Sequence, residues 1–287
     1  MKFRISRKLK LLGITAALFG GITAPLVAES DEGRTVSVAL EGSYAPWNMT
    51  PPGGKMTGFE PELLEDLCRR IALRCVPVAQ DFDGLIPGLQ AGKFDVLMDA
   101  LAITPEREQA IAFSRPYAST PASFAVTDLK AVPPEMRQSP MLKLAANGKS
   151  NGPEIDQLRR ELKGRTIGLQ SGTVYTKFVT ENFKDVATIR MYKTSGERDV
   201  DLANGRIDVA FDDVTYYAGV SGVNGATKLT LVGPQIGGTV WGPGEGLGFR
   251  KQDAALRVKF DTAIAAAIAD GTVSRLSQKW FHVDVKP

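Results

Sequence analysis

The chain alternates short apolar runs with segments whose apolar residues recur at helical spacing. This alternation is typical of α/β folds with largely parallel sheets. A polar stretch rich in proline and glycine, from 128 to 152, interrupts the pattern once. The predicted strands are 35–40, 76–78, 94–98 and 165–169, and the predicted helices are 60–71, 85–91, 154–162 and a helix starting near Thr173.

Two stretches that lie 113 residues apart repeat one pattern. Residues 89–99 (LQAGKFDVLMD) and 202–212 (LANGRIDVAFD) both read Leu-x-x-Gly-basic-apolar-Asp-Val-x-apolar-Asp. In each stretch we expect a helix to stop at a left-handed glycine and a short buried strand to follow and end on a carboxylate. The repeat predicts two α/β lobes, each with an acid at the carboxyl edge of its sheet, where open α/β sheets bind ligands.

The C-terminal part of the chain is too short to form a lobe of its own. It reads as a strand at 245–249, an alanine-rich helix at 254–269 and a short helix at 273–280. We expect it to pack on the first lobe, which gives lobe 1 as 29–124 and 241–287 and lobe 2 as 125–240. Two extended strands near 121–127 and 239–242 would then form a hinge, and the glycines of 242–248 would permit rotation there.

The N-terminus predicts export. Five basic residues within the first ten precede an apolar run from Leu11 to Val27, which glycines and a proline interrupt. The run is short for a bilayer span, so we interpret 1–28 as a cleavable signal peptide with cleavage after Ala28. No cysteine lies near that site, and a soluble periplasmic protein is expected.

Charge and composition exclude several functions. Removal of 1–28 leaves 30 basic and 32 acidic residues, a net charge of −2, with no run of Lys or Arg that would indicate nucleic acid as a partner. The single histidine, His282, excludes a histidine-cluster metal site and the usual serine or cysteine triad. We therefore expect neither a metal nor a cofactor.

The two cysteines, Cys68 and Cys75, follow one another closely near the end of a predicted helix. In an exported chain a disulfide between them is expected, with two buried free thiols as the alternative. Such a small ring would stabilise the fold by ~2–3 kcal/mol as a local clamp.

Five motifs are distinctive in combination: YAPWN at 44–48, GFE at 58–60, DGLIPGL at 83–89, Asp95-Val with ITPER at 103–107, and GLQSGT at 168–173. Together they resemble the periplasmic polar-amino-acid-binding proteins of ABC importers. Within that family the resemblance is stronger to the histidine and lysine/arginine/ornithine binders, whose disulfide has a spacing similar to that of Cys68 and Cys75. It is stronger still to the octopine- and nopaline-binding proteins, to which the segment after Asp128 and the glycines of 237–248 are similar.

The resemblance implies a two-lobed, type II-like periplasmic binding fold with a two-strand hinge. It implies a monomer without cofactor that binds an amino-acid-derived ligand and docks on an ABC permease in the inner membrane. Arg107 would bind the ligand's α-carboxylate, because a guanidinium presents a planar fork that matches a carboxylate. Backbone N–H groups of Gly172 and Thr173, at a helix start, would bind the same group.

The other site residues also follow from the resemblance. Asp213 would hold the α-ammonium, and Glu41 and Asp99 would face the distal end of the ligand, which favours a cationic side chain. Tyr44 and Phe82 would sandwich the apolar stem. The remaining expected lining residues are Trp47, Ala100, Ala102, Gln170 and Val174.

Two positions depart from the family pattern. Ala102 and Val174 stand where a serine and a second threonine are usual, so an unbranched amino acid would lose hydrogen bonds of ~1 kcal/mol each. The smaller side chains leave room, which favours a substituted amino acid such as an opine over free arginine, lysine, ornithine or histidine. An enzyme on the same scaffold, a periplasmic dehydratase with Glu41 or Asp99 as acid or base, is the alternative class.

Each of these residues also has a structural interpretation. Arg107 could form a surface ion pair with Glu108, and the acids Asp213 and Asp99 could cap turns or helices. Glu41 could be a solvated loop acid. Tyr44, Trp47 and Phe82 could be aromatic residues of the core.

Overall fold

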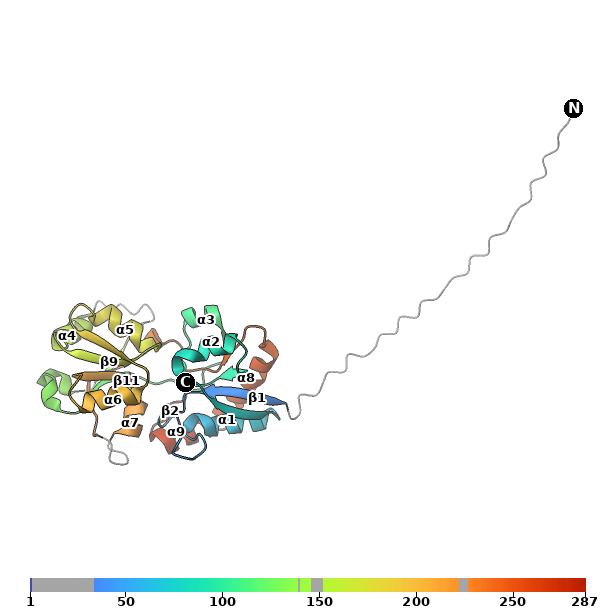
Figure 1. Cartoon of the computed structure of the whole chain (residues 1–287), viewed down its shortest axis with the longest axis horizontal. Coiled ribbons are helices and arrows are strands. Elements are labelled where there is room, and N and C mark those ends of the chain that lie inside the picture. Colours follow the sequence, from blue (N-terminus) through green and yellow to red (C-terminus); the bar gives the residue numbers. More distant parts are fainter. Residues whose placement is uncertain (2–33, 139, 146–151, 222–226) are drawn as a thin grey trace. The chain divides into compact units, whose positions relative to one another are not determined.

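The computed structural model describes residue 1 and residues 34–138, 140–145, 152–221 and 227–287 (Figure 1). The predicted signal peptide at 1–28 lies outside these residues. The chain from Glu32 onward is one compact unit, and it contains two central sheets. We call each sheet with the helices packed on it a lobe.

The first lobe is built on a five-stranded sheet. Its strands, in spatial order, are β4 (Arg74–Ala79), β1 (Thr35–Leu40), β5 (Val96–Leu97), β13 (Gly248–Phe249) and β6 (Ala112–Phe113). β1 runs parallel to β4 and β5, whereas β13 is antiparallel to its neighbours. The helices of this lobe are α1 (Phe59–Arg70), α2 (Leu85–Gln90), α3 (Pro105–Ala110), α8 (Ala254–Ala269) and α9 (Thr272–Phe281).

The C-terminal segment packs on the first lobe as expected. α8 and α9 both contact α1, and β13 lies inside the five-stranded sheet. Val38 of β1, Leu63 of α1 and Phe260 of α8 are fully buried in one core cluster. A small hairpin of β2 (Ser43–Tyr44) and β3 (Asn48–Met49) and a short 3-10 helix η1 (Phe82–Gly84) complete the edge that faces the second lobe.

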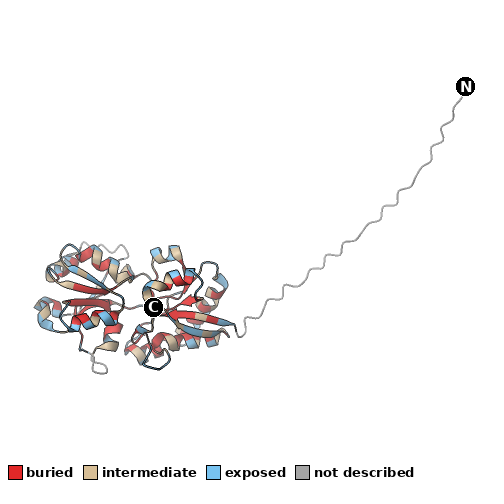
Figure 2. Ribbon diagram, viewed as in Figure 1, coloured by how far each residue is buried: buried red, intermediate tan, exposed pale blue. Residues whose placement is uncertain are grey.

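The second lobe is built on a six-stranded sheet. Its strands, in spatial order, are β10 (Thr188–Tyr192), β9 (Thr166–Gln170), β11 (Val209–Asp213), β7 (Ala122–Val126), β12 (Thr230–Gly237) and β8 (Met141–Lys143). Its helices are α4 (Pro153–Glu161), α5 (Val174–Phe183), α6 (Ser195–Ala203) and α7 (Val214–Val220), with 3-10 turns η2 (Leu129–Ala131), η3 (Pro134–Arg137) and η5 (Thr239–Trp241). Figure 2 shows buried residues concentrated along the strands of both lobes.

The repeated sequence forms the same unit in both lobes. Gly92 and Gly205 follow α2 and α6 with φ of 72° and 67°, the left-handed conformation that glycine adopts without steric cost. Asp95 and Asp208 then each accept a hydrogen bond from a backbone N–H of the neighbouring parallel strand, at 3.0 and 2.7 Å. The repeat therefore places equivalent strands, β5 and β11, inside the two sheets, with their carboxyl ends at the same kind of sheet edge.

The cysteines form the expected disulfide. Cys68 lies in the last turn of α1 and Cys75 in β4, with 6.1 Å between their Cα atoms. The bond ties the end of this helix to the strand that follows it. Among the described residues, no helix combines the length and apolarity of a membrane span.

Most predicted elements are present within a few residues of their expected bounds, but one prediction at the hinge is wrong. Residues 239–242 do not form an extended strand, because 239–241 make the 3-10 turn η5 between two glycines of positive φ. The strand predicted at 245–249 is confined to β13, while β10 and β12 and helix α7 were not predicted.

Two segments connect the sheets, one between β6 and β7 and one between β12 and β13. They meet as an antiparallel bridge between Ala118 and Glu245, and Glu245 also bridges to Ala102. The predicted lobe boundary at 124/125 falls inside β7, which pairs only within the six-stranded sheet. The division into 29–124 with 241–287 and 125–240 remains a proposal.

Candidate functional site

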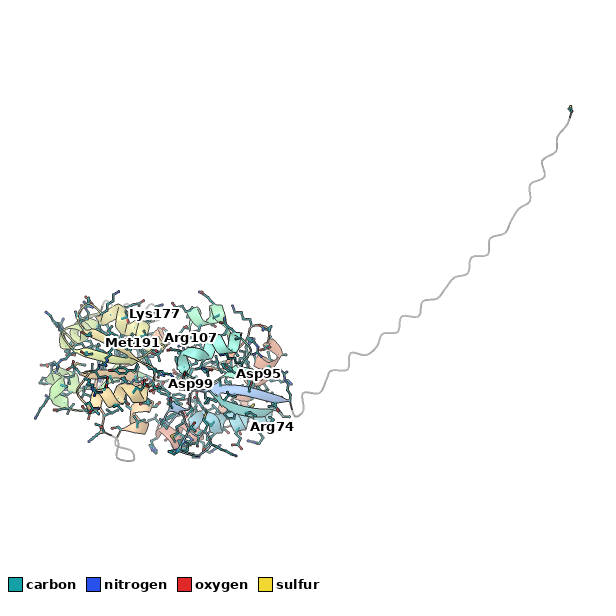
Figure 3. The ribbon with its side chains drawn as sticks, viewed as in Figure 1. Arg74, Asp95, Asp99, Arg107, Lys177 and Met191 are labelled. Atoms are coloured by element: carbon teal, nitrogen blue, oxygen red, sulfur yellow. A yellow bond between two sulfur atoms is a disulfide. The ribbon has the colours of Figure 1, made fainter. Side chains whose placement is uncertain are left out.

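A cavity lies between the lobes, at the edges where the strands of both repeats end. The space between its lining side chains is about 490 Å³ when its opening to solvent is included. Figure 3 shows Asp99 and Arg107 near the middle of the described structure, where the two lobes meet. The lining residues are Glu41, Tyr44, Phe82, Asp99, Ala100, Ala102 and Arg107 with Gln170, Thr173, Val174, Tyr175, Asp212, Trp241 and Glu245.

Arg107 lies in α3, and its guanidinium contacts main-chain carbonyls. Nη1 donates to the Ala102 carbonyl at 2.8 Å and Nη2 to the Gly172 carbonyl of the other lobe at 3.0 Å, and the group lies over the Phe82 ring. No carboxylate of the described residues, Glu108 included, lies within ion-pair distance of it. Burial lowers the pKa of Arg107 to about 10. The site thus contains a cation without an anionic partner from the described chain.

Four carboxyl groups line the same cavity, and Asp212 is the most fully bonded of them. It accepts hydrogen bonds from the Tyr44 hydroxyl at 2.7 Å and the Ser195 hydroxyl at 2.6 Å, and it pairs with the buried Arg198. Tyr44 comes from the first lobe and stacks on Tyr216 of the second, with ring centroids 4.9 Å apart. Asp212 therefore joins the lobes through Tyr44 and has little capacity left for a ligand.

Asp99 and Glu41 form a second acidic group, on the side of the first lobe. One oxygen of Asp99 accepts from the Glu41 backbone N–H at 3.1 Å and from Asn48 at 2.6 Å, whereas Oδ2 is buried without a partner among the described residues. Burial, followed by the charges of Glu60 and Glu41, raises the pKa of Asp99 well above its usual value. Burial also raises the pKa of Glu41, whose carboxyl accepts a hydrogen bond from Gln170 of the other lobe at 3.0 Å.

Glu245 lines the cavity from the segment that connects β12 to β13. Its Oε1 accepts from the Thr120 hydroxyl at 3.2 Å, and its Oε2 is buried without a partner among the described residues. Burial, followed by the charge of Asp213, raises the pKa of Glu245 to about 8.

Three predicted site residues, Trp47, Gly172 and Asp213, are not among the residues that line the cavity. Trp47 is fully buried between Phe59 and Phe281, and its indole N–H donates to Thr215, so the core interpretation describes it. Gly172 lies next to the cavity, and its carbonyl oxygen accepts a hydrogen bond from Arg107.

Asp213 caps α7 instead of facing the cavity. Its Oδ1 accepts from the Thr215 backbone N–H at 2.6 Å and the Thr215 hydroxyl at 2.5 Å, and Oδ2 accepts from Thr120. Burial raises the pKa of Asp213 to about 6. The neighbouring Asp212 occupies the cavity wall, and the repeat contained the signal for it, because Asp212 is the counterpart of Asp99.

Tyr175, Trp241 and Glu245 also line the cavity and were not predicted. Tyr175 follows Val174 in the first turn of α5, so the helix start that the sequence located could have indicated it. Trp241 and Glu245 come from the glycine-rich connection, where no local pattern distinguishes cavity residues from hinge residues. Within the described ranges these carboxyls do not form a group that could hold a metal ion.

The fold and cavity define a protein of the two-lobed α/β binding type. A structure titled as a periplasmic His/Glu/Gln/Arg/opine family-binding protein from Silicibacter pomeroyi in complex with lysine matches with a TM-score of 0.70 and 29% identity, covering 88% of this chain and 99% of that one. The octopine-binding periplasmic protein of Rhizobium meliloti is 36% identical over 272 residues, which span 88% of this chain and 92% of the relative. The L-arginine-binding protein of Pseudomonas aeruginosa is 28% identical, spanning 97% and 98%.

The model of the bacterial extracellular solute-binding proteins, family 3, matches residues 36–283. This match covers most of the chain, and the chain belongs to that family.

Proposed function

We propose that this protein is the periplasmic substrate-binding component of an ABC importer and that its ligand is an opine or a related substituted basic amino acid. One observation carries the proposal: among the described residues that line the cavity there are four carboxyl groups and one arginine, and no carboxylate of the described chain pairs with that arginine. A ligand with both an anionic and a cationic end satisfies this arrangement, because each end meets the opposite charge away from water.

The two acids on the side of the first lobe support a ligand whose distal end carries a positive charge. Asp99 has a buried oxygen without a partner in the described chain, and Glu41 lies beside it. A guanidinium or ammonium at the distal end of the ligand would supply the missing donors. The relatives named above as binders of octopine and arginine support a ligand of this class.

The part of the cavity that would bind the ligand's carboxylate favours an opine over free arginine. Ala102 and Val174 both line the cavity, and neither side chain can donate a hydrogen bond to a ligand carboxylate. Among the described lining residues, Arg107 is the one with charged donors, and the space beside the two small side chains suits an additional substituent. Free basic amino acids are the second candidate.

The mechanism is capture by closure, without chemical change of the ligand. The ligand first contacts Arg107 and Tyr44 on the first lobe, and the second lobe then closes over it with Thr173 and Asp212 on its inner wall. Contacts across the cavity would hold the closed form, such as Ser171 to Asp83 at 2.7 Å and Lys193 to Asp81 at 2.9 Å. The closed form would then dock on the permease.

Calorimetric titration with octopine, nopaline, arginine, lysine, ornithine and histidine tests the ligand assignment. We expect the opines to bind more tightly than the free amino acids. Tight binding of arginine, ornithine or histidine together with no binding of opines would reverse the order. Mass spectrometry of the incubated ligands tests the absence of catalysis, since turnover beyond one equivalent would identify an enzyme.

Small-angle scattering tests closure. We expect the radius of gyration to decrease when a bound ligand draws the lobes together, whereas a ligand that binds without changing the scattering profile would contradict the closure mechanism.

A further inference from the structure

Glu245 lines the cavity, but the proposed mechanism gives it no role. It lies on the connection between the lobes, where its backbone N–H donates to the Ala118 carbonyl at 2.9 Å and its carbonyl accepts from Tyr117 at 2.9 Å. The preceding residue, Gly244, has a φ of 136°, and a Cβ there would lie 2.3 Å from the Ala118 carbonyl oxygen. Only glycine permits this close approach, which keeps the backbone of Gly244 and Glu245 against Ala118.

Glu245 is 6% exposed, and only one of its two carboxyl oxygens has a partner among the described residues. Oε1 shares the Thr120 hydroxyl with Asp213, while Oε2 has no partner among the described residues. A buried acceptor without a donor costs free energy, and a ligand donor would remove that cost.

The other carboxyls near this end of the cavity have their partners within the chain. The oxygens of Asp213 are occupied by Thr215 and Thr120, and those of Asp212 by Tyr44, Ser195 and Arg198. In the cavity lining, the buried carboxylate oxygens without a described partner belong to Asp99 and Glu245. Since Asp99 lies beside Glu41, at the end proposed for the ligand's basic side chain, Glu245 remains for a second donor of the ligand.

We propose that Glu245 binds the α-nitrogen of the ligand, either a primary ammonium or the secondary ammonium of an N-substituted amino acid. Ala102, which bridges to Glu245 in the backbone, also supplies the carbonyl that holds Arg107. Ala102 thus links the residue that would hold the nitrogen to the residue that would hold the carboxylate, and an α-amino acid carries these two groups close together. This inference rests on the proposed function, and it replaces Asp213 by Glu245 as the residue that contacts the nitrogen.

The test removes one partner at a time. Wild type and Glu245→Gln are titrated with L-arginine, octopine and 5-guanidinopentanoate, which is arginine without its α-nitrogen. Gln keeps the size of the side chain and removes its charge. We expect the affinity of Glu245→Gln for arginine and octopine to fall at least about tenfold, and its affinity for 5-guanidinopentanoate to change less than about twofold. Glu181→Gln, an exposed residue of α5, is the matched control and should bind like wild type.

A second measurement needs no variant. The carboxyl and phenol groups near Glu245 are Asp213, Glu60, Tyr117 and Tyr175, and Arg107 lines the same cavity. A cationic nitrogen favours the ionised form of Glu245, so binding below pH 8 should release a proton and affinity for arginine should rise from pH 6 to pH 8. The affinity for 5-guanidinopentanoate should rise less than that for arginine, because this probe lacks the nitrogen that would ionise Glu245 and meets only Asp99 and Glu41, whose pKa values burial also raises.

The outcomes are distinct. Equal losses of affinity for arginine and 5-guanidinopentanoate in Glu245→Gln, or no loss for either, would overturn the role of Glu245 while leaving the proposed function intact. The same holds if Asp213→Asn, and not Glu245→Gln, loses affinity selectively for arginine and lacks the additional proton release. If wild type binds none of the three probes nor the other opines and basic amino acids, the proposed function fails and this inference fails with it.

Discussion

At the scale of single residues, Arg107 carries most of the proposed recognition of the ligand's anion. Its guanidinium contacts two carbonyl oxygens and an aromatic face, none of which neutralises its charge. Replacing Arg107 with alanine should weaken binding of the tightest ligand by about 2–5 kcal/mol, the range for truncating one partner of a buried charge pair. Calorimetry measures this loss.

Arg275→Ala is the control for that measurement. Arg275 is an exposed residue of α9, outside the cavity lining, and its loss should leave affinity unchanged. If Arg107→Ala loses less than about threefold in affinity, under ~1 kcal/mol, the residue does not bind the carboxylate.

At the scale of elements, the repeated unit depends on the glycine that ends its helix. Gly205 has a φ of 67°, and a Cβ there would meet nothing within 4 Å, so any cost of substitution comes from the backbone and not from crowding. Gly205→Ala should lower the free energy of unfolding by about 1–2 kcal/mol, the cost of a left-handed conformation for an L-residue. Urea denaturation measures the change.

Gly196 provides the matched comparison in the same helix. It lies in the first turn of α6 without a positive φ, and a Cβ there would only touch the Thr194 hydroxyl at 3.9 Å. Gly196→Ala should therefore stabilise the protein, by up to about 1 kcal/mol. Opposite signs for the two variants support the capping role, and a loss of stability in both would contradict it.

At the scale of the whole molecule, the acids buried between the lobes make the stability of the ligand-free protein depend on pH. Burial raises the pKa of Glu245 to about 8 and that of Asp213 to about 6, whereas an unfolded carboxyl titrates near pH 4. Between these values the folded protein binds more protons than the unfolded chain, so its stability falls as pH rises. We expect a higher thermal midpoint at pH 5.5 than at pH 8.5.

The variant Glu245→Gln isolates the contribution of one of these acids. It cannot ionise, so the midpoint should vary less between the two pH values than in the wild type. An unchanged pH dependence would mean that Glu245 is not the group that titrates. Asp95 has the opposite effect. Burial would raise its pKa, but hydrogen bonds from Ser37 and Arg250 outweigh burial and lower it. Ionised Asp95 therefore stabilises the folded protein, and this stabilisation is lost only as the pH falls into the acidic range.

Much of the fold could be predicted from the chain because it depends on local chemistry. Helix and strand periodicity, the glycine stops at Gly92 and Gly205 and the short spacing of Cys68 and Cys75 all act over a few residues. β1 and α8 were predicted with the bounds that they have in the structure. The strand β10 was missed because it is an edge strand without a buried residue, and β12 because its buried positions do not alternate as a strand pattern predicts.

Local patterns along the chain were sufficient to predict two α/β lobes, an acid at the end of each repeated strand and an arginine after the first of them. They could not predict which of two neighbouring side chains faces the cavity, because that depends on how the strands pack. Asp212 lines it while Asp213 caps a helix, because successive residues of a strand point to opposite faces. Packing likewise placed Trp47 in the core and brought Glu245 into the cavity, since those positions depend on where the lobes and their connections meet in space.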